Sequence, residues 1–275
     1  MIDLANKIKN YQYSSMEYAD IEAISSSVTY IDTDDSLFLY SVEDEKAKID
    51  WATNTKESFF DGLKKTINQI SRNHPIKKIY IEFIPEDYVH EMEELGFIIA
   101  SEFIDFWNNR LEAIDLKQQD SLIIRKIKED EYHEASEVSK SCKGYSRGFE
   151  GESDERIKEW NESENSSIFA AEKNSEIIGI CCVNLYGHES AKGTVLWIRE
   201  IAVKPSYHSQ KIGFHLLAYA INWGINNGAV RSFLLCDAEN VKAIRLYEGL
   251  GYERKPARGQ INMELGIDKG SVPLF

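Results

Sequence analysis

The sequence predicts a two-domain protein of the α/β class with a mixed, partly parallel sheet. At 275 residues the chain is longer than one small core requires, since domains usually hold roughly 100 to 200 residues. Strand-like and helix-like apolar patterns alternate in both halves of the chain. A polar, aperiodic stretch at residues 113–120 separates the halves. The expected domains are therefore residues 1–117 and 118–275.

The second half has the clearer order of elements. Apolar runs predict strands at residues 122–127, 168–173, 177–186, 194–203 and 232–237. Helical spacing and end signals predict helices at residues 130–142, 153–160, 212–226 and 241–250. A final hairpin is expected from Tyr252 to about Leu265. Helices between strands indicate that part of the sheet is parallel.

The first half repeats part of this order. A helix, a strand and a second helix at residues 56–71, 79–84 and 85–94 precede Leu95-Gly96-Phe97, as similar elements precede Leu250-Gly251-Tyr252. The two endings differ by 155 positions. A chance similarity of two common helix–glycine–strand junctions is the alternative, but three elements in the same order favour a repeat.

Composition is that of an ordinary globular protein, with 43% apolar and 28% charged residues. No apolar run reaches the length of a membrane span, and the start lacks a basic segment followed by an apolar one, so no membrane partner is expected. The four cysteines form no Cys-x-x-Cys pair, which favours a reducing, cytoplasmic location and no metal site.

The net charge of −14 is unevenly spread. Residues 1–120 hold 12 Lys+Arg against 24 Asp+Glu, whereas residues 121–275 hold 20 against 22. Nucleic acid is not an expected partner, because the acidic half would repel a polyanion. Residues 199–258 are locally basic, which would favour a phosphorylated ligand, although a window of this size can vary that much by chance. Nothing in the pattern predicts an oligomeric state.

The junction at residues 203–213 leads from a strand through a polar turn into a helix. Unpaired N–H groups and the helix dipole at such a start attract phosphate. Gly213 would let the backbone approach a ligand, and His208 and Lys211 could donate to it. Most junctions of this kind bind nothing, so the turn alone does not define a site.

Two segments make the pattern specific. They are Ile201-Ala202-Val203-Lys204-Pro205 with His208-x-x-Lys211-x-Gly213, and Asn240-x-x-Ala243-x-x-Leu246-Tyr247-x-x-Leu250-Gly251-Tyr252. In order and spacing they resemble the GNAT acetyltransferases. The chain departs from the family at His208, where Gln or Arg is usual, and at Lys211, where glycine is usual. The resemblance covers residues 121–267 and, weakly, the first half, as in a tandem GNAT protein with a degenerate N-terminal copy.

The resemblance implies acetyl-CoA as co-substrate, with no metal. The backbone of Ile201, Ala202 and Val203 would pair with the pantetheine arm as an added strand. The pyrophosphate would lie on the turn formed by His208, Ser209, Gln210, Lys211, Ile212, Gly213 and Phe214. Asn240 would contact the coenzyme and also serve as a helix N-cap. Tyr247 would face the sulfur and protonate the departing thiolate, the alternative being a core aromatic.

Direct attack by an amine also needs a base and a donor to the oxyanion. Glu200 is the expected base, directly or through water; the alternative is an exposed strand carboxylate. Arg199 is expected on the opposite face of the strand. A backbone N–H near Ile201 would serve the oxyanion.

The loop between the first two helices is expected to cover the acceptor, with Tyr145, Arg147 and Phe149 as its contacts. Its three glycines also fit a surface loop without a role. The predicted function is transfer of acetyl to an amine of a small molecule or peptide. The alternatives are a non-enzymatic acyl-CoA-binding or regulatory module, transfer of another acyl group, or a hydroxyl acceptor. The first copy is expected to be silent, because Met92 and Pro85 stand in place of Tyr247 and Asn240.

Overall fold

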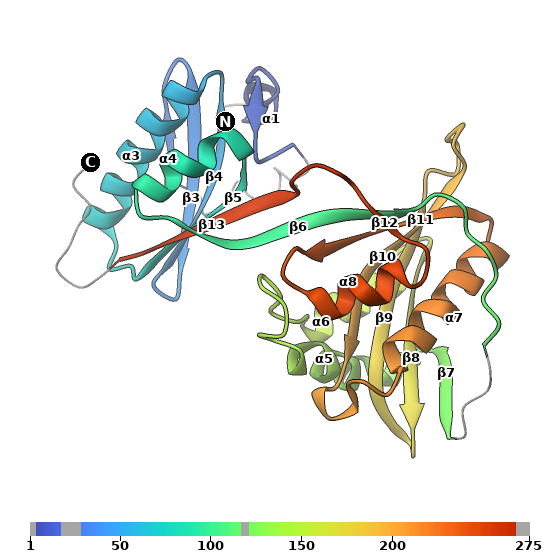
Figure 1. The fold of residues 1–275 in the computed structure, drawn as a ribbon. Helices are drawn as coiled ribbons and strands as arrows, with labels where there is room; N and C mark the ends of the chain where they lie inside the picture. The colour runs from blue at the N-terminus through green and yellow to red at the C-terminus, as the bar shows by residue number, and fades with distance from the viewer. Residues whose placement is uncertain (1–3, 18–28, 117–120, 268–275) are drawn as a thin grey trace. The chain divides into compact units, whose positions relative to one another are not determined.

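The computed structural model describes residues 4–17, 29–116 and 121–267, which form two compact units (Figure 1). Unit 1 comprises Met1–Ser101 and Gln260–Phe275, and unit 2 comprises Glu102–Gly259. These bounds differ from the expected division near residue 117, because each half contributes a strand to the other unit. Strand β6 (Ile98–Asn108) continues into unit 2, and β13 (Gln260–Gly266) belongs to unit 1.

Unit 1 is a mixed sheet in the strand order β2-β3-β4-β5-β13, covered by helices. Its elements are α1 (Leu4–Ile8), β1 (Tyr13–Ser14), β2 (Thr29–Asp32), β3 (Ser36–Glu43), β4 (Lys46–Thr53), α3 (Lys56–Asn73), β5 (Lys78–Ile84), η1 (Glu86–Tyr88) and α4 (Val89–Glu94). Strands β4 and β5 are parallel and are connected through α3.

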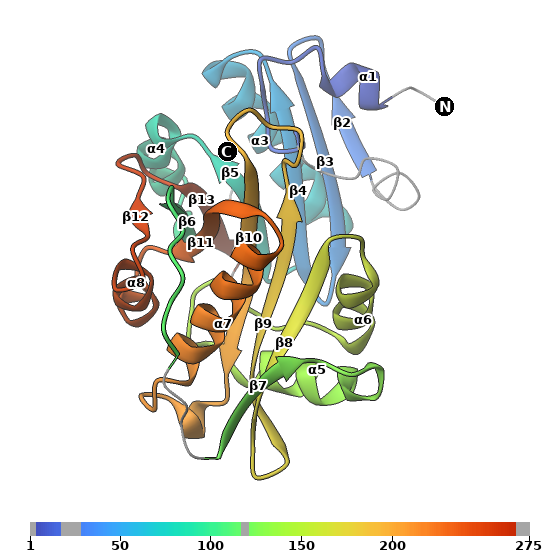
Figure 2. The same ribbon diagram turned by 90° about the vertical axis from the view of Figure 1, so that its right-hand side faces the viewer.

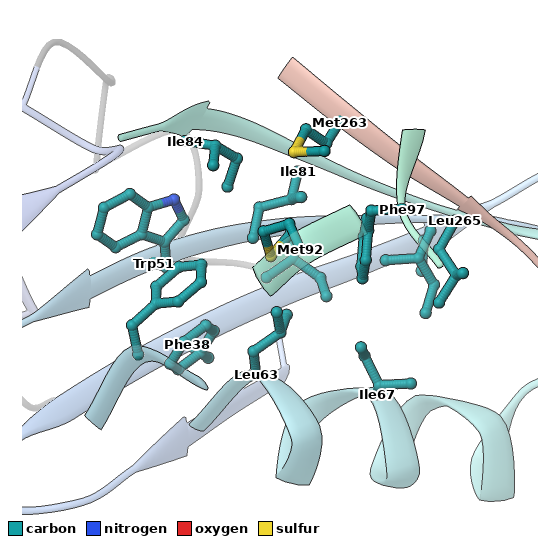
Figure 3. Packing of buried hydrophobic residues seen from close by; sticks show 14 of the residues in the cluster. Phe38, Trp51, Leu63, Ile67, Ile81, Ile84, Met92, Phe97, Met263 and Leu265 are labelled. Atoms are coloured by element: carbon teal, nitrogen blue, oxygen red, sulfur yellow. The ribbon is translucent and has the colours of Figure 1, made fainter. Parts of the chain in front are cut away.

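The core of unit 1 lies between this sheet and helices α3 and α4. Apolar residues at helical spacing on α3, including Leu63 and Ile67, pack on Trp51 and Ile81 of the sheet (Figure 3). Met92 of α4 is fully buried in the same cluster. Strand β13 completes the core with Met263 and Leu265, which explains why the last strand of the chain lies in unit 1.

Unit 2 has the strand order β6-β11-β10-β9-β8-β7. Its further elements are β7 (Leu122–Lys126), η2 (Glu129–Glu131), α5 (Tyr132–Ser141), α6 (Asp154–Glu162), β8 (Ser166–Lys173), β9 (Glu176–Tyr186), β10 (Thr194–Val203), η3 (Pro205–Tyr207), α7 (Ile212–Asn226), β11 (Ala229–Asp237), α8 (Val241–Glu248) and β12 (Glu253–Arg254). Strands β10 and β11 are parallel and are connected through α7. The predicted order is confirmed as far as α8.

The predicted final hairpin is wrong. Strand β12 pairs with β6 at Trp107 and Phe106, and β13 pairs with β5 in unit 1. The position beside β11 is taken by β6, which pairs with it from Ser232 to Asp237. The last strands of the chain therefore separate instead of pairing with each other.

Helices cover the two faces of the unit 2 sheet in pairs (Figure 2). Helices α7 and α8 pack on the face that carries Leu196, Ile198 and Leu234. Helices α5 and α6 pack on the opposite face, against Ile180, Cys182 and Ala202. Residues of β10 therefore reach one helix pair or the other according to their place along the strand.

Candidate active site

Strands β10 and β11 separate partway along their length. Their parallel pairing runs from Thr194 opposite Ala229 to Ile198 opposite Leu234. Beyond that point β10 pairs with β9, and β11 pairs with β6, but within the described residues the two strands have no further pairs with each other. The edge of β10 at Ile201, Ala202 and Val203 that faces β11 thus has no strand partner. An extended ligand could add to it by main-chain hydrogen bonds.

A β-bulge in β10 lies at the start of this gap. The register with β9 shifts between Ile198 and Glu200, which leaves Arg199 as the extra residue. A bulge brings consecutive side chains toward one side of a sheet. The guanidinium Nη1 of Arg199 accordingly lies 3.7 Å from the Glu200 carboxylate. The expectation that Arg199 points to the opposite face is wrong, because it assumed unbroken alternation.

Glu200 is a buried carboxylate on the face covered by α5 and α6. Only 7% of the residue is exposed, which rules out the alternative of an exposed strand carboxylate. The hydroxyl of Ser139 on α5 donates a hydrogen bond to its Oε1. Burial raises the pKa of Glu200 above its ordinary value, and Glu152 adds to the rise, while the Ser139 hydrogen bond and Arg199 oppose it. A raised pKa suits a carboxylate that takes a proton near neutral pH.

Tyr247 lies on the other face, on helix α8. It packs with Phe106 and Tyr252 in the core under α7 and α8 and is 6% exposed. Burial raises its pKa well above the ordinary value, with Cys236 and Cys181 as electrostatic neighbours, and Cys181 is the register partner of Ile201. The Tyr247 hydroxyl has no hydrogen-bond partner among the described residues, so the phenol can both pack and donate.

The turn before α7 exposes a run of main-chain donors. From Ser209 to Phe214, no main-chain N–H finds an acceptor in the described parts of the chain, and no side chain caps the helix. Lys211, the N-cap residue, has φ 61° and ψ 13°, in the left-handed region. That conformation favours glycine, which explains the family's usual residue at this place. Lys211 follows the same path at some conformational cost.

Gly213 lies within this turn, and Asn240 lies at the start of α8. A Cβ added to Gly213 would lie 3.3 Å from Cδ2 of Leu246 and 3.8 Å from Cδ1 of Ile201, so a larger side chain would enter the space between β10 and α8. The Oδ1 of Asn240 accepts from the N–H of Ala243 at 3.2 Å, which confirms the predicted N-cap. Its Nδ2 has no partner in the described residues.

One ring nitrogen of His208 already has a partner within the chain, so the imidazole is not free to donate to a phosphate from both nitrogens. Its Nε2 lies 2.7 Å from the carbonyl oxygen of Val203, and its ring meets the ring of Tyr145 edge-on at 5.1 Å. Only Nδ1 remains for a ligand. The Sγ of Cys142 donates to the same carbonyl. His208 thus fixes the end of β10 and the start of the turn.

The loop at residues 143–152 spans the two separated strands. Tyr145, 56% exposed, packs on His208 beyond the end of β10. Arg147 donates from Nε to the buried Asp237 at the end of β11 (3.1 Å) and pairs with Glu239 (2.9 Å). Phe149 packs on the core under α5 and α6. The structure therefore brings Tyr145 and Arg147 to the gap and gives Phe149 a packing role.

Sequence reasoning missed Ser139, Glu152 and Asp237. Ser139 Oγ donates to Glu200 and accepts from the N–H of Glu152 at 2.9 Å, while Nη2 of Arg199 contacts the Glu152 carboxylate. The available signal is that Ser139 lies among the buried residues of the amphipathic helix α5. A polar residue at a core position needs a partner, which points to a nearby charge.

Residues 130–252, slightly less than half of the chain, match the Acetyltransferase (GNAT) family, and this match supports an acyltransferase. No curated protein sequence matches the chain.

Solved structures share the fold over most of the chain. A GCN5-related N-acetyltransferase from Sphaerobacter thermophilus is 14% identical with a TM-score of 0.59, over 86% of this chain and 84% of its own. One from Kribbella flavida is 12% identical with a TM-score of 0.55, over 92% and 95%. A tandem GNAT protein from the clavulanic acid biosynthesis pathway is 9% identical with a TM-score of 0.57, over 84% and 79%. The two-domain α/β fold class is thus confirmed.

The described residues were also compared with the requirements of a metal site and of a membrane-spanning helix. Among residues 4–17, 29–116 and 121–267, no three His, Cys, Asp or Glu side chains are grouped so that they could hold a metal ion. Within the same ranges, no helix has the length and apolar character needed to cross a membrane.

Proposed function

We propose that residues 118–275 transfer an acetyl group from acetyl-CoA to an amine of a small molecule or peptide by direct attack. The observation that carries this proposal is the gap between β10 and β11, with Glu200 on one face of the sheet and Tyr247 on the other. A base on the acceptor side and an acid on the coenzyme side are the two groups that the reaction needs.

The groups around the gap fit a coenzyme A thioester. The unpaired edge of β10 offers main-chain groups to the amides of a pantetheine arm. The free N–H groups from Ser209 to Phe214 suit a pyrophosphate at the start of α7. Lys211 adds a cation, and the free Nδ2 of Asn240 adds a donor.

The chemistry divides between the two faces. Glu200 takes a proton from the attacking amine, directly or through water, and the nitrogen forms its bond to the thioester carbonyl carbon. Main-chain N–H groups on the free edge of β10 stabilise the oxyanion. Tyr247 gives its proton to the sulfur as the carbon–sulfur bond breaks. Because burial keeps the Tyr247 pKa high, the phenol holds this proton at neutral pH.

The acceptor would lie under the loop at residues 143–152, against Tyr145 and Arg147, with Phe149 holding the loop to the core. Residues 1–117 would be a degenerate GNAT-like copy without catalytic activity. Its parallel β4 and β5, connected through α3, have the same arrangement as β10 and β11 connected through α7. Met92 is a core residue there, which fits the absence of an acid at that position.

A non-enzymatic acyl-CoA-binding module is the second candidate. It stays open because His208 and Lys211 depart from the residues that are usual in the family at this turn. The two functions are separated by an acceptor screen that follows release of free CoA thiol over amino acids, polyamines, aminoglycosides and peptides. Amine-dependent release with an acetylated product supports the enzyme, whereas coenzyme binding without release for every class supports the module.

A further inference from the structure

Unit 1 contains a strand gap of the same kind as the one in unit 2. The parallel pairing of β4 and β5 runs from Lys46 opposite Lys78 to Ile49 opposite Ile81. Strand β4 then continues to Thr53 and β5 to Ile84, without further pairs to each other in the described residues. The edge of β4 beyond Ile49 corresponds to the edge of β10 that would receive a pantetheine arm.

This edge of β4 is occupied by the chain itself. Strand β3 pairs with the whole of the other edge, so β1 must use the edge that β5 leaves, where Tyr13 pairs with Thr53 and Ser14 with Ala52. The N–H of Ser15 donates to the Trp51 carbonyl at 2.9 Å, and the N–H of Trp51 donates to Ser15 Oγ at 2.9 Å. Residues 13–15 thus occupy this edge as an added strand would, through main-chain contacts and through the Ser15 hydroxyl, which accepts from the Trp51 N–H.

The gap itself is bridged by Trp51. Its indole is 2% exposed and packs edge-on against Phe59 at 4.8 Å. Its Nε1 donates to the carbonyl oxygen of Glu82, on β5, at 2.9 Å. Figure 3 shows the indole in the core beside Ile84 and Phe38. A buried, hydrogen-bonded indole leaves no room there for a thioester.

The helix start that follows is also satisfied internally. Thr55 and Ser58 form a capping box. The N–H of Ser58 donates to Thr55 Oγ1 at 3.1 Å, and the N–H of Thr55 donates to Ser58 Oγ at 3.1 Å. Lys56 pairs with Glu91 at 2.6 Å. Helix α7 in unit 2 has no such cap, and its first N–H groups are free. A phosphate at α3 would have to displace the cap.

We propose that unit 1 contains a coenzyme groove closed by its own residues. Residues 13–15 occupy the position of the pantetheine arm. Trp51 occupies the position of the thioester end, and the Thr55–Ser58 capping box occupies the position of the phosphates. This inference rests on the proposed function, because the open groove of unit 2 defines which part of the coenzyme each of these three features would replace. It follows that a chain has one coenzyme site and that residues 13–15 hold unit 1 together instead of being displaced by a ligand.

The first test is calorimetric titration of the full chain with CoA. The wild type should bind one CoA per chain. Gly213→Glu places a carboxylate at the turn of unit 2 and should abolish binding while the fold survives, because Leu246 is the nearest group and is flexible. Asn226→Glu adds the same charge at the exposed far end of α7 and should bind as the wild type does. Two sites, or one site remaining in Gly213→Glu, would overturn the inference.

The second test does not depend on CoA. In hydrogen exchange of the free protein, the amides of Ser15 and Trp51 should exchange at least about tenfold more slowly than the unbonded amides of residues 209–214. Ser15→Ala should release the Trp51 amide alone, since only that amide uses the hydroxyl. Rapid exchange at both wild-type amides would contradict the closed groove. A wild type that binds no CoA would instead contradict the proposed function, while the exchange data would still decide whether the groove is closed.

Discussion

The hydroxyl of Ser139 donates a hydrogen bond to Oε1 of Glu200, from helix α5 to strand β10. The same hydroxyl accepts from the main-chain N–H of Glu152, at the end of the acceptor loop. The proposed base is thereby fixed in position by the helix that covers its face. The loop at residues 143–152, which would bind the acceptor, is held at its end by the same Ser139 hydroxyl.

Ser139→Ala should move the acid limb of the rate profile to higher pH. The Ser139 hydrogen bond lowers the pKa of Glu200, so its loss lets burial raise that pKa further, and the base becomes protonated at a higher pH. The profile of kcat/KM against pH measures this shift. Ser141→Ala is the control, because its hydroxyl bonds to the Val138 carbonyl and not to Glu200. A shift toward lower pH would contradict the assignment of the base.

Tyr247→Phe should lower kcat by about 10-fold or more, since general acid catalysis contributes about 10² to 10⁴ and a thiolate can also leave unaided. Affinity for acetyl-CoA and the melting temperature should change little, because the ring stays packed and the hydroxyl has no partner among the described residues. Stopped-flow measurement of the chemical step gives the comparison. An unchanged chemical step would remove Tyr247 from the mechanism, and loss of the fold would make it a packing residue only.

Arg147→Met should lower stability and raise the KM for the acceptor. It keeps the apolar stem but leaves the buried Asp237 carboxylate without its ion pair, a loss of about 1–3 kcal/mol. The main-chain donors of Glu102 and Glu239 still serve Asp237, which keeps the loss within that range. Thermal unfolding and acceptor kinetics measure the two effects. Arg156→Met, which removes an exposed pair with Glu159, should change neither, and equal effects of both variants would contradict a special role for Arg147.

Lys211→Gly should separate the two roles of this position. Glycine relieves the left-handed conformation, worth roughly 1–2 kcal/mol, but adds entropy to the unfolded chain, so a net gain of up to about 1 kcal/mol in stability is expected. Loss of the cation should weaken coenzyme affinity, and less so as salt rises. Thermal unfolding and CoA titration at two salt concentrations measure both. A less stable variant would show that the observed φ of Lys211 carries no strain.

Much of unit 2 could be predicted from the sequence, because its patterns are local. Asn174 and Ser175, both at positive φ, form the turn between β8 and β9, and α7 ends with its C-cap at Asn227, which is followed by Gly228 at positive φ. Gly213 of the first motif segment lies at the start of α7, near Ile201 on the free edge of β10. Asn240 of the second motif segment is the N-cap of α8. Each of these depends on a few neighbouring residues, so spacing and residue type are sufficient to predict them.

The exchange of strands and the bulge could not be predicted in this way. In the sequence, β6 and β13 look like the last strands of the first and second halves of the chain. Their actual partners, β11 and β5, are set by tertiary packing. The bulge at Arg199 adds one residue without any glycine or proline to mark it. Strict alternation along β10 places Arg199 on the wrong face, and the pairing of residues 13–15 with the β4 edge has no signal in the sequence.

The central claim is that Glu200 and Tyr247 face each other across a thioester held between β10 and β11. It is tested most directly by acetyl transfer with Glu200→Gln, using the amine that the acceptor screen returns. The variant keeps Oε1 as an acceptor for Ser139, and it removes the cost of burying a charge. The raised folded-state pKa of Glu200 means that this cost grows as pH rises above the ordinary Glu value, so the variant should be no less stable than the wild type at neutral pH.

The measurement is the single-turnover rate of product formation at saturating acetyl-CoA, for wild type and Glu200→Gln. We expect the rate to fall by about 10² to 10⁴ in the variant, with acetyl-CoA affinity unchanged. An equal rate in both proteins, with chemistry limiting, would contradict the account.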